Sequence, residues 1–242
     1  MNGDDVPLQE YDFINGATLL VDKPEGWTSF DVVNKIRYKL KHRLGVKKIK
    51  VGHAGTLDPM ATGLLIICTG KATKQLHGFQ GLDKDYTGTI TIGATTPSFD
   101  KETPIDETFP IDHITPALLE KKRHQFIGEI SQVPPVFSAI KVDGQPLYKR
   151  ARKGEIFEVQ PRKVVIAAFD LTRIEIPEVD FHVSCGKGTY IRSLANDFGK
   201  ALESGAYLSA LRRTRVGEFS IANAWNLEEL ISLLEMTPIR EE

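Results

Sequence analysis

Strand-type and helix-type segments are interleaved along this chain, without an internal repeat and without the regular rhythm of βαβ units. The clearest strand is predicted over 86–93, where Ile90 and Ile92 share one face and Thr89 and Thr91 share the other. Further strands are predicted over 17–24, 66–68, 164–169 and 179–185. This mixture favours an α+β fold with a mixed, largely antiparallel sheet flanked by helices.

Cap residues and apolar periodicity predict the helices. Thr28 or Ser29 can cap one helix, with Asp31 in its first turn, and Thr115 followed by Pro116 opens another that ends near residue 126. Further helices are predicted over 70–78 and 190–202. The apolar stripe predicted for the first helix consists of Phe30, Val33, Leu40 and Leu44, with basic residues on its other side.

The chain has 242 residues, which is enough for one large domain or two small ones. No change of composition marks a linker, so we expect a single domain over 1–242 with residues 1–14 as a flexible tail. The segment 132–161 is rich in proline, glycine and charge and lacks periodicity. A connection of this length is usually functional or mobile.

Composition narrows the class of protein. With 41% hydrophobic and 26% charged residues, the chain is typical of a globular protein. No apolar run approaches the roughly 20 residues of a membrane helix, and the acidic residues 1–10 do not resemble a secretory signal. Cys68 and Cys185 stand in apolar segments, which favours buried free thiols and a reducing cytoplasm. Zinc-ligand spacings and nucleotide-binding glycine motifs are absent, so we expect neither a metal nor another cofactor.

Basic residues are concentrated locally, although the formal net charge is only −1. Residues 35–50 hold eight lysines and arginines and no acidic residue, and a second basic stretch runs over 141–163. A solvated helix face is the ordinary explanation of a charge run, but like charges four residues apart repel each other. We therefore favour nucleic-acid binding, because phosphate contacts depend on local potential rather than on net charge.

One carboxylate has two interpretations. Asp58 stands in the polar segment 53–63, between the basic stretch and the apolar run 64–68. On local chemistry alone, an aspartate before a proline is usually a turn residue, because it bonds to its own backbone. The alternative is a catalytic carboxylate, which local chemistry alone does not favour and which rests on a resemblance to a known family.

Residues 52–63 (G-H-A-G-T-L-D-P-M-A-T-G) and four further segments, in the expected order, resemble the motifs of the tRNA pseudouridine-55 synthase family. The further segments begin at Val21 (V-D-K-P-x-G-x-T-S), Lys84 (K-D-Y-x-G), Gln132 (Q-V-P-P-x-F-S-A-x-K) and Cys185 (C-G-K-G-T-Y-I-R-S-L), and Leu208 (L-x-x-L-R-R) closes the set. The match covers about residues 17–230. It implies a pseudouridine synthase fold with a central RNA-binding cleft, and isomerisation of one T-loop uridine of tRNA without a cofactor.

The resemblance also implies roles for single residues. Asp58 would be the nucleophile, Arg192 the cation that keeps it ionised, and Tyr86 the aromatic residue that stacks on the flipped uracil. His53 either fills the space that the base vacates or forms hydrogen bonds within the loop. Lys23 either supports the Asp58 loop or binds phosphate.

Four more residues complete the expected site. Tyr190 is expected to pack against the Asp58 loop and Leu211 to form a wall of the uridine pocket. Tyr148 and Arg152 are expected to contact the T-loop, which the segment 132–161 would clamp.

Two departures from the family pattern stand out. Family members often carry a C-terminal RNA-binding domain of the PUA type, whereas this chain ends soon after Trp225 with an acidic, helix-like tail. We therefore expect a short form without that domain. The loop 95–100 is also altered, although Asp100 falls where an acidic residue is expected.

Three alternatives remain open. A non-catalytic tRNA-binding or tRNA-folding protein on the same scaffold would suit the basic segments, but it would not need Asp58, Tyr86 and Arg192 together. A synthase guided by a small RNA would need a PUA domain, and an aspartyl-nucleophile hydrolase would need a D-x-D motif that is absent. We expect a stand-alone, monomeric, cytoplasmic enzyme that binds the T-arm of tRNA and no membrane.

Overall fold

The computed structural model describes residues 8–138, 141–142, 145–146 and 159–236. The chain forms two compact units. The first unit consists of residues 1–86 and 212–242, and the second unit consists of residues 87–211. Strands β4 (Lys84–Ile92) and β12 (Ala206–Val216) contribute to both units, because the boundaries fall inside them.

The first unit is built on a mixed sheet with the strand order β14-β1-β3-β12. Strand β3 (Thr62–Thr69) is antiparallel to β1 (Thr18–Lys23) and parallel to β12, and β14 (Trp225–Asn226) is parallel to β1. The C-terminal half of β3 also pairs with β2 (Val51–Ala54), and β13 (Phe219–Ser220) pairs with the C-terminal end of β12. Two short 3-10 helices, η1 (Leu8–Glu10) and η4 (Ile221–Asn223), flank these strands in the sequence.

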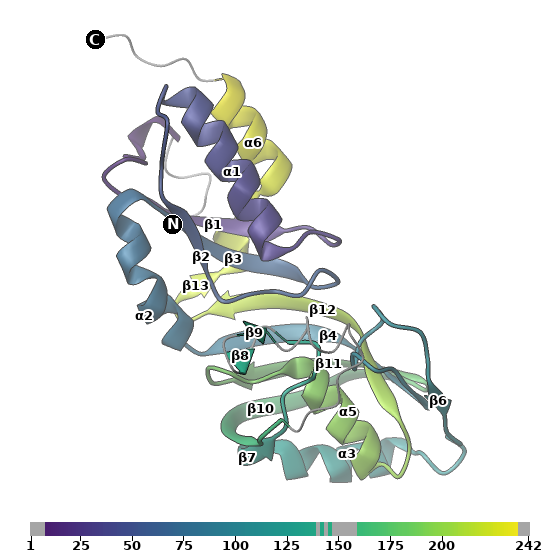
Figure 1. Cartoon of the computed structure of the whole chain (residues 1–242). Helices are drawn as coiled ribbons and strands as arrows, with labels where there is room; N and C mark the ends of the chain where they lie inside the picture. The colour runs from purple at the N-terminus through teal and green to yellow at the C-terminus, as the bar shows by residue number, and fades with distance from the viewer. Residues whose placement is uncertain (1–7, 139–140, 143–144, 147–158, 237–242) are drawn as a thin grey trace. The chain divides into compact units, whose positions relative to one another are not determined.

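Strand β3 is apolar on both faces because both faces are covered. Leu65 and Ile67 join the core beneath α1 (Ser29–Arg43) and α6 (Leu227–Met236), which lie side by side in Figure 1. Leu64 and Ile66 face the opposite way, into a second core with η2 (Gly70–Gln75) and α2 (Leu76–Gly81). An uninterrupted apolar run is therefore compatible with alternating strand geometry here.

Helix α1 begins at a capping box. The Asp31 N–H donates to Thr28 Oγ1 (3.0 Å), and the Thr28 N–H donates back to the Asp31 carboxylate (2.9 Å). The predicted apolar stripe is wrong at Phe30, which is 59% exposed. Val33 and Leu40 are buried as predicted, and the buried face also includes Val32 and Ile36. Phe30 falls outside this face because successive helical residues are rotated by about 100°.

The second unit combines a sheet with helices. The strand order is β12-β4-β11-β10-β7, in which β10 (Arg162–Glu175) is antiparallel to both β11 (Glu178–Cys185) and β7 (Gly128–Gln132). The helices are α3 (Pro116–Arg123), which continues into η3 (His124–Phe126), and α5 (Ile191–Ala201). Two further strand pairs are β5 (Ala94–Thr95) with β6 (Glu107–Thr108), and β8 (Lys141–Val142) with β9 (Gln145–Pro146).

Buried phenylalanines fix α5 on the second unit's sheet. Phe169 of β10 makes edge-to-face contacts with Phe181 of β11 and with Phe198 of α5, at centroid distances of 6.0 and 5.4 Å. All three side chains are at most 1% exposed. Each such pair stabilises the fold by about 0.5–1.5 kcal/mol beyond the effect of the apolar area that it buries. These contacts therefore determine the orientation of α5. The α+β class predicted from the sequence is confirmed.

Candidate functional site

Asp58 stands in the loop 55–61, which connects β2 to β3. The loop is held by Ser29, the first residue of α1. The Leu57 N–H donates to Ser29 Oγ (2.9 Å), and the Ser29 hydroxyl lies 3.2 Å from the Leu57 carbonyl. On the other side of Asp58, the Gly26 N–H donates to the Pro59 carbonyl (2.8 Å). The partly buried Asp58 is thus carried on a backbone that is fixed on both sides.

Lys23 lies beneath the same loop, and its side chain is fully buried. Its ammonium group donates to the carbonyls of Pro24 (2.9 Å), Trp27 (2.6 Å) and Pro59 (3.3 Å). A buried cation is costly unless hydrogen bonds replace its lost hydration, and these carbonyls provide them. Of the two roles that the sequence leaves open for Lys23, this geometry favours support of the loop over contact with phosphate.

Arg213 of β12 anchors the start of the loop. This arginine is only 1% exposed, and it donates to the carbonyls of Gly55 (3.0 Å) and Leu64 (2.7 Å). Arg213 pairs with Gly63 in the β12–β3 register. Gly63 has φ of +106°, and a Cβ there would lie 2.3 Å from the Arg213 carbonyl oxygen. Only glycine meets both requirements, so the end of the loop is fixed by a close backbone approach.

His53 lies in β2, opposite Ile67 of β3. Burial lowers the pKa of the His53 imidazole, and the nearby Arg213 guanidinium lowers it further, against a hydrogen bond with Gly55. The ring is therefore neutral at pH 7. Its Nδ1 atom is buried and has no hydrogen-bond partner among the described residues.

Tyr86 and Leu211 are both buried, at 8% and 7% exposure, in β4 and β12 respectively. Beside Tyr86, Asp85 forms a bidentate ion pair with Arg215, with N–O distances of 2.5 and 2.8 Å. This pair raises the pKa of Arg215. It also fixes the start of β4 within the first unit.

Arg192 lies in the first turn of α5, in the second unit, and is 4% exposed. Its guanidinium donates to the carbonyls of Ser98 (3.1 Å) and Phe137 (3.0 Å) and lies 3.4 Å from an Asp100 carboxylate oxygen. Asp100 is fully buried and accepts hydrogen bonds from the Ser98 hydroxyl (2.5 Å) and the Glu102 N–H (2.9 Å). On local sequence alone a helical arginine is expected at the surface. Here several acceptors hold it in place.

Of the remaining predicted site residues, the structure describes Tyr190 but not Tyr148 or Arg152. Tyr190 immediately precedes α5, and the Arg162 guanidinium lies over its ring at 4.6 Å from the centroid. Tyr148 and Arg152 lie outside the described residues. Lys23, His53, Asp58 and Tyr86 belong to the first unit, whereas Tyr190, Arg192 and Leu211 belong to the second.

Comparison with models of protein families shows which family the chain belongs to. The model described as the N-terminal domain of the TruB family of pseudouridylate synthases matches residues 41–191, and the model of the tRNA pseudouridylate synthase B C-terminal domain matches residues 192–241. This chain belongs to the TruB family. The family resemblance stated from the motifs is thereby confirmed.

TruB-family relatives match nearly the whole chain. The tRNA pseudouridine synthase B of Flavobacterium johnsoniae is 57% identical over 88% of this chain and 93% of its own length. That of Phocaeicola vulgatus is 53% identical over 95% of this chain and 97% of its own length. Among solved structures, a chain of a Cbf5–Nop10–Gar1 complex superposes with a TM-score of 0.70 and 28% identity. The match covers 96% of this chain but only 58% of that one.

Sequence reasoning missed three residues that hold candidate site residues in place within their own units. It assigned no role to Ser29 beyond a helix cap, none to Asp100 beyond its acidic character, and none to Arg213. The doublet Arg212-Arg213 was the available signal, because adjacent residues of a strand face opposite sides of the sheet, and one of the two is buried where both faces are covered. Both cysteines are free and buried, as predicted. Within the described ranges, no helix is long and apolar enough to cross a membrane.

Proposed function

We propose that this chain isomerises a uridine of tRNA to pseudouridine, and that its target is the T-loop uridine at position 55. Family membership and the printed name of the relatives, tRNA pseudouridine synthase B, support the reaction and the class of RNA. The observation that carries the proposal is the Asp58 loop, which Ser29, Lys23 and Arg213 anchor to three different elements. A turn residue without a catalytic role would not require such support.

The reaction is a rearrangement within one nucleotide. The bond between N1 of uracil and C1′ of the ribose breaks, the base turns, and a bond forms between C5 and C1′. The C5 hydrogen leaves as a proton and N1 gains one, so that no oxidant or cofactor is needed. Because a stacked base cannot turn, the uridine must first be flipped out of the loop.

We assign the chemistry to Asp58, Tyr86 and Arg192. Asp58 is the nucleophile, and desolvation by the bound base would favour its protonated form unless a fixed cation opposed it. Arg192 is that cation, because a guanidinium stays charged when buried. Tyr86 stacks on the flipped uracil. A neutral His53, whose buried Nδ1 is unpaired among the described residues, fits the space that the base leaves in the T-loop.

The other assignments concern RNA binding and the state of the protein. Tyr190 packs against the Asp58 loop, Leu211 forms a wall of the uridine pocket, and Tyr148 and Arg152 contact the T-loop. We further propose that residues 1–242 act as a single catalytic domain, that the enzyme is a cytoplasmic monomer, and that it recognises the T-arm rather than the whole tRNA.

Product mapping tests the proposal. Unmodified tRNA and an isolated T-arm hairpin are incubated with the enzyme, cleaved with a nuclease, and analysed by chromatography and mass spectrometry after pseudouridine-specific labelling. We expect pseudouridine at position 55 alone in both substrates, and none when that uridine is replaced by cytidine. Pseudouridine at another position would contradict the assigned target, and binding without any product would favour a non-catalytic tRNA-binding protein.

A further inference from the structure

The segment 132–137 is bonded to the start of α5 in three places. Gln132, Val133 and Phe137 contact Tyr190, Ser193 and Arg192 respectively. The Ser193 hydroxyl donates to the Val133 carbonyl (2.7 Å), and Arg192 Nη2 donates to the Phe137 carbonyl (3.0 Å). In these two bonds a side chain of α5 binds the backbone of the segment, whereas at Gln132 a buried side chain of the segment binds the backbone of Tyr190.

Gln132 bonds to both polar groups of the Tyr190 backbone. Its side-chain Nε2 donates to the Tyr190 carbonyl (3.0 Å), and its Oε1 accepts from the Tyr190 N–H (2.8 Å). Gln132 is fully buried. A primary amide presents a donor and an acceptor side by side, which matches the N–H and C=O of one residue. An ionised glutamate cannot reproduce this pair of bonds because it has no donor.

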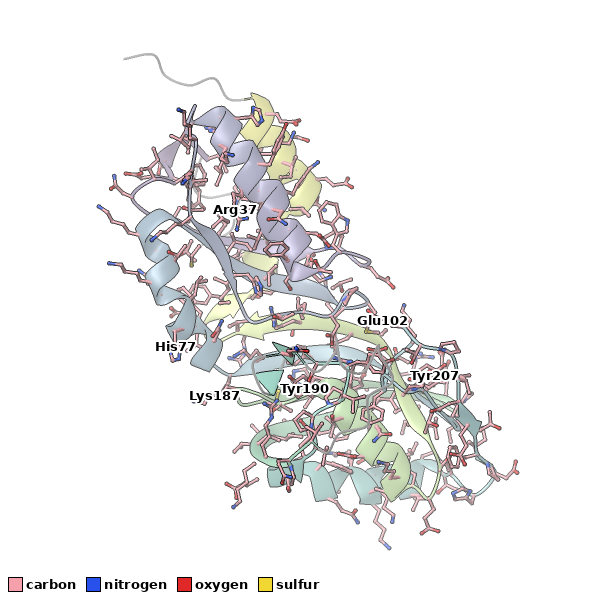
Figure 2. The ribbon with its side chains drawn as sticks, in the orientation of Figure 1. Arg37, His77, Glu102, Lys187, Tyr190 and Tyr207 are labelled. Carbon is pink, nitrogen blue, oxygen red and sulfur yellow. The ribbon has the colours of Figure 1, made fainter. Side chains whose placement is uncertain are left out.

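Tyr190 is the N-cap residue of α5, and no side-chain cap stabilises this helix. The Gln132 amide therefore fixes the residue from which α5 starts, two positions before Arg192. Arg162, which is directly opposite Gln132 in the β10–β7 register, stacks on the Tyr190 ring and donates to the Gly188 carbonyl. Figure 2 labels Tyr190, the residue that precedes α5.

We propose that Gln132 is a positioning residue for Arg192 in the reaction. By clamping the Tyr190 backbone, Gln132 sets the rotation and height of the first turn of α5 and hence the place of the guanidinium. Its loss would slow the chemical step without weakening RNA binding, because a small displacement of a catalytic group costs rate. This inference rests on the proposed function, since it takes Arg192 to be catalytic.

Single-turnover tritium release from tRNA that carries [5-³H]uridine tests the inference, with tRNA affinity measured separately by filter binding. The variant Gln132→Met removes both hydrogen bonds at similar side-chain length. We expect its rate constant to fall by about tenfold or more while the Kd for tRNA stays within about threefold. The matched control is Gln125→Met, which alters an exposed glutamine of η3, outside the segment 132–161, and should keep the wild-type rate.

Gln132→Glu adds a readout that a general loss of stability would not give. A protonated glutamic acid can donate to the Tyr190 carbonyl and accept from its N–H as glutamine does, whereas the ionised form repels the carbonyl. Burial raises the pKa of such a carboxyl, so the rate relative to wild type should recover by about tenfold between about pH 8 and about pH 5.5. Circular dichroism at each pH confirms that the variant is folded.

Three outcomes would overturn the inference. These are a wild-type rate in Gln132→Met, a rate loss fully explained by weaker tRNA binding, or a pH profile of Gln132→Glu parallel to that of wild type. If Gln132→Met does not fold, the pH dependence of the Gln132→Glu rate, relative to that of wild type, decides whether the inference holds. A wild-type protein that released no tritium would overturn the proposed function as well, so the two failures are distinguishable.

Discussion

Carbonyl oxygens hold the buried cations of this TruB-family chain. Lys23 donates to three carbonyls, Arg213 donates to two, and Arg192 donates to two and lies beside Asp100. A carbonyl fixes the position of a cation without neutralising it. Lys23 and Arg213, which contact the Asp58 loop, can therefore be buried and still contribute positive charge near it, whereas Arg192 also lies beside the Asp100 carboxylate.

The first prediction concerns the shape of the Arg192 head group. Arg192→Lys should lose most of the activity although the charge is kept, because one ammonium cannot reach both carbonyls in the geometry of the planar guanidinium. Single-turnover tritium release measures the effect, and the Kd for tRNA should change little. Arg173→Lys is the control, since Arg173 lies in an ion-pair cluster on the β10–β11 hairpin. A wild-type rate in Arg192→Lys would refute the proposed role of the guanidinium.

The second prediction concerns pH. The pKa of His53 is lowered in the folded chain, mainly by burial, so the unfolded chain takes up a proton first as the pH falls. The stability that His53 contributes is present above the unfolded pKa of about 6.5 and is lost as the pH drops below it.

Urea unfolding at about pH 7.5 and about pH 5.5 measures this effect. The free energy of unfolding should fall less on acidification in His53→Gln than in wild type. His77→Gln, at an exposed position of α2, is the control. An identical fall in wild type and His53→Gln would show that His53 is not the group responsible.

At the scale of elements, the junction of β2, β3 and β12 shapes the Asp58 loop. The third prediction is that Gly63→Ala destabilises the first unit, because the new Cβ would meet the Arg213 backbone and the residue has a positive φ. The expected loss is about 2–4 kcal/mol in the free energy of unfolding, with a matching loss of activity.

Gly78→Ala is the matched control for Gly63→Ala. Gly78 lies in α2, and a Cβ there would meet no atom within 4 Å. Its replacement by alanine should leave the stability unchanged or raise it by up to about 1 kcal/mol. Equal stability of the two variants would contradict the close approach of β12 to the loop.

Much of the fold followed from periodicity and cap residues. The strands predicted over 17–24 and 179–185 agree closely with β1 and β11, and Thr28 and Thr115 cap α1 and α3 as predicted. These signals are local, since a cap or an alternation involves only a few neighbouring residues.

The rest depended on contacts that are distant in the sequence. Strand β12 was missed because its arginines hide the alternation, and Arg213 is buried only because carbonyls of Gly55 and Leu64 accept its hydrogen bonds. Gln132 is separated from Tyr190 by 58 residues, so no local pattern could reveal their contact. The candidate site residues were named as a set only by resemblance, and both the set and the roles of its members remain predictions.

At the scale of the whole molecule, the local distribution of charge determines phosphate binding more than the net charge of −1 does. Lys47, Lys48 and Lys50 precede β2 and are exposed. They form no ion pair within the described part of the chain. Such uncompensated lysines are suited to phosphate contacts, whereas Lys39 is paired with Glu235 of α6.

The fourth prediction is that the affinity for tRNA falls steeply with salt, and that these three lysines account for part of the slope. Replacing Lys47, Lys48 and Lys50 by glutamine should lower the slope of log K against log salt by up to about 3, because each lost phosphate contact removes about one unit. The control replaces Lys121 and Lys122 of α3. A flat salt response in wild type would argue against a phosphate-binding surface.

The central claim is that Asp58 is the nucleophile of a single-site pseudouridine synthase, and tritium release from [5-³H]uridine-labelled tRNA tests it most directly. Wild type and the control Asp112→Asn, altered at an exposed aspartate, should release about one tritium per tRNA, because isomerisation at one uridine expels one C5 hydrogen. Asp58→Asn should release none while its Kd for tRNA stays within about threefold of wild type. Release by Asp58→Asn at the wild-type rate, or a folded wild type that binds tRNA and releases nothing, would contradict the claim.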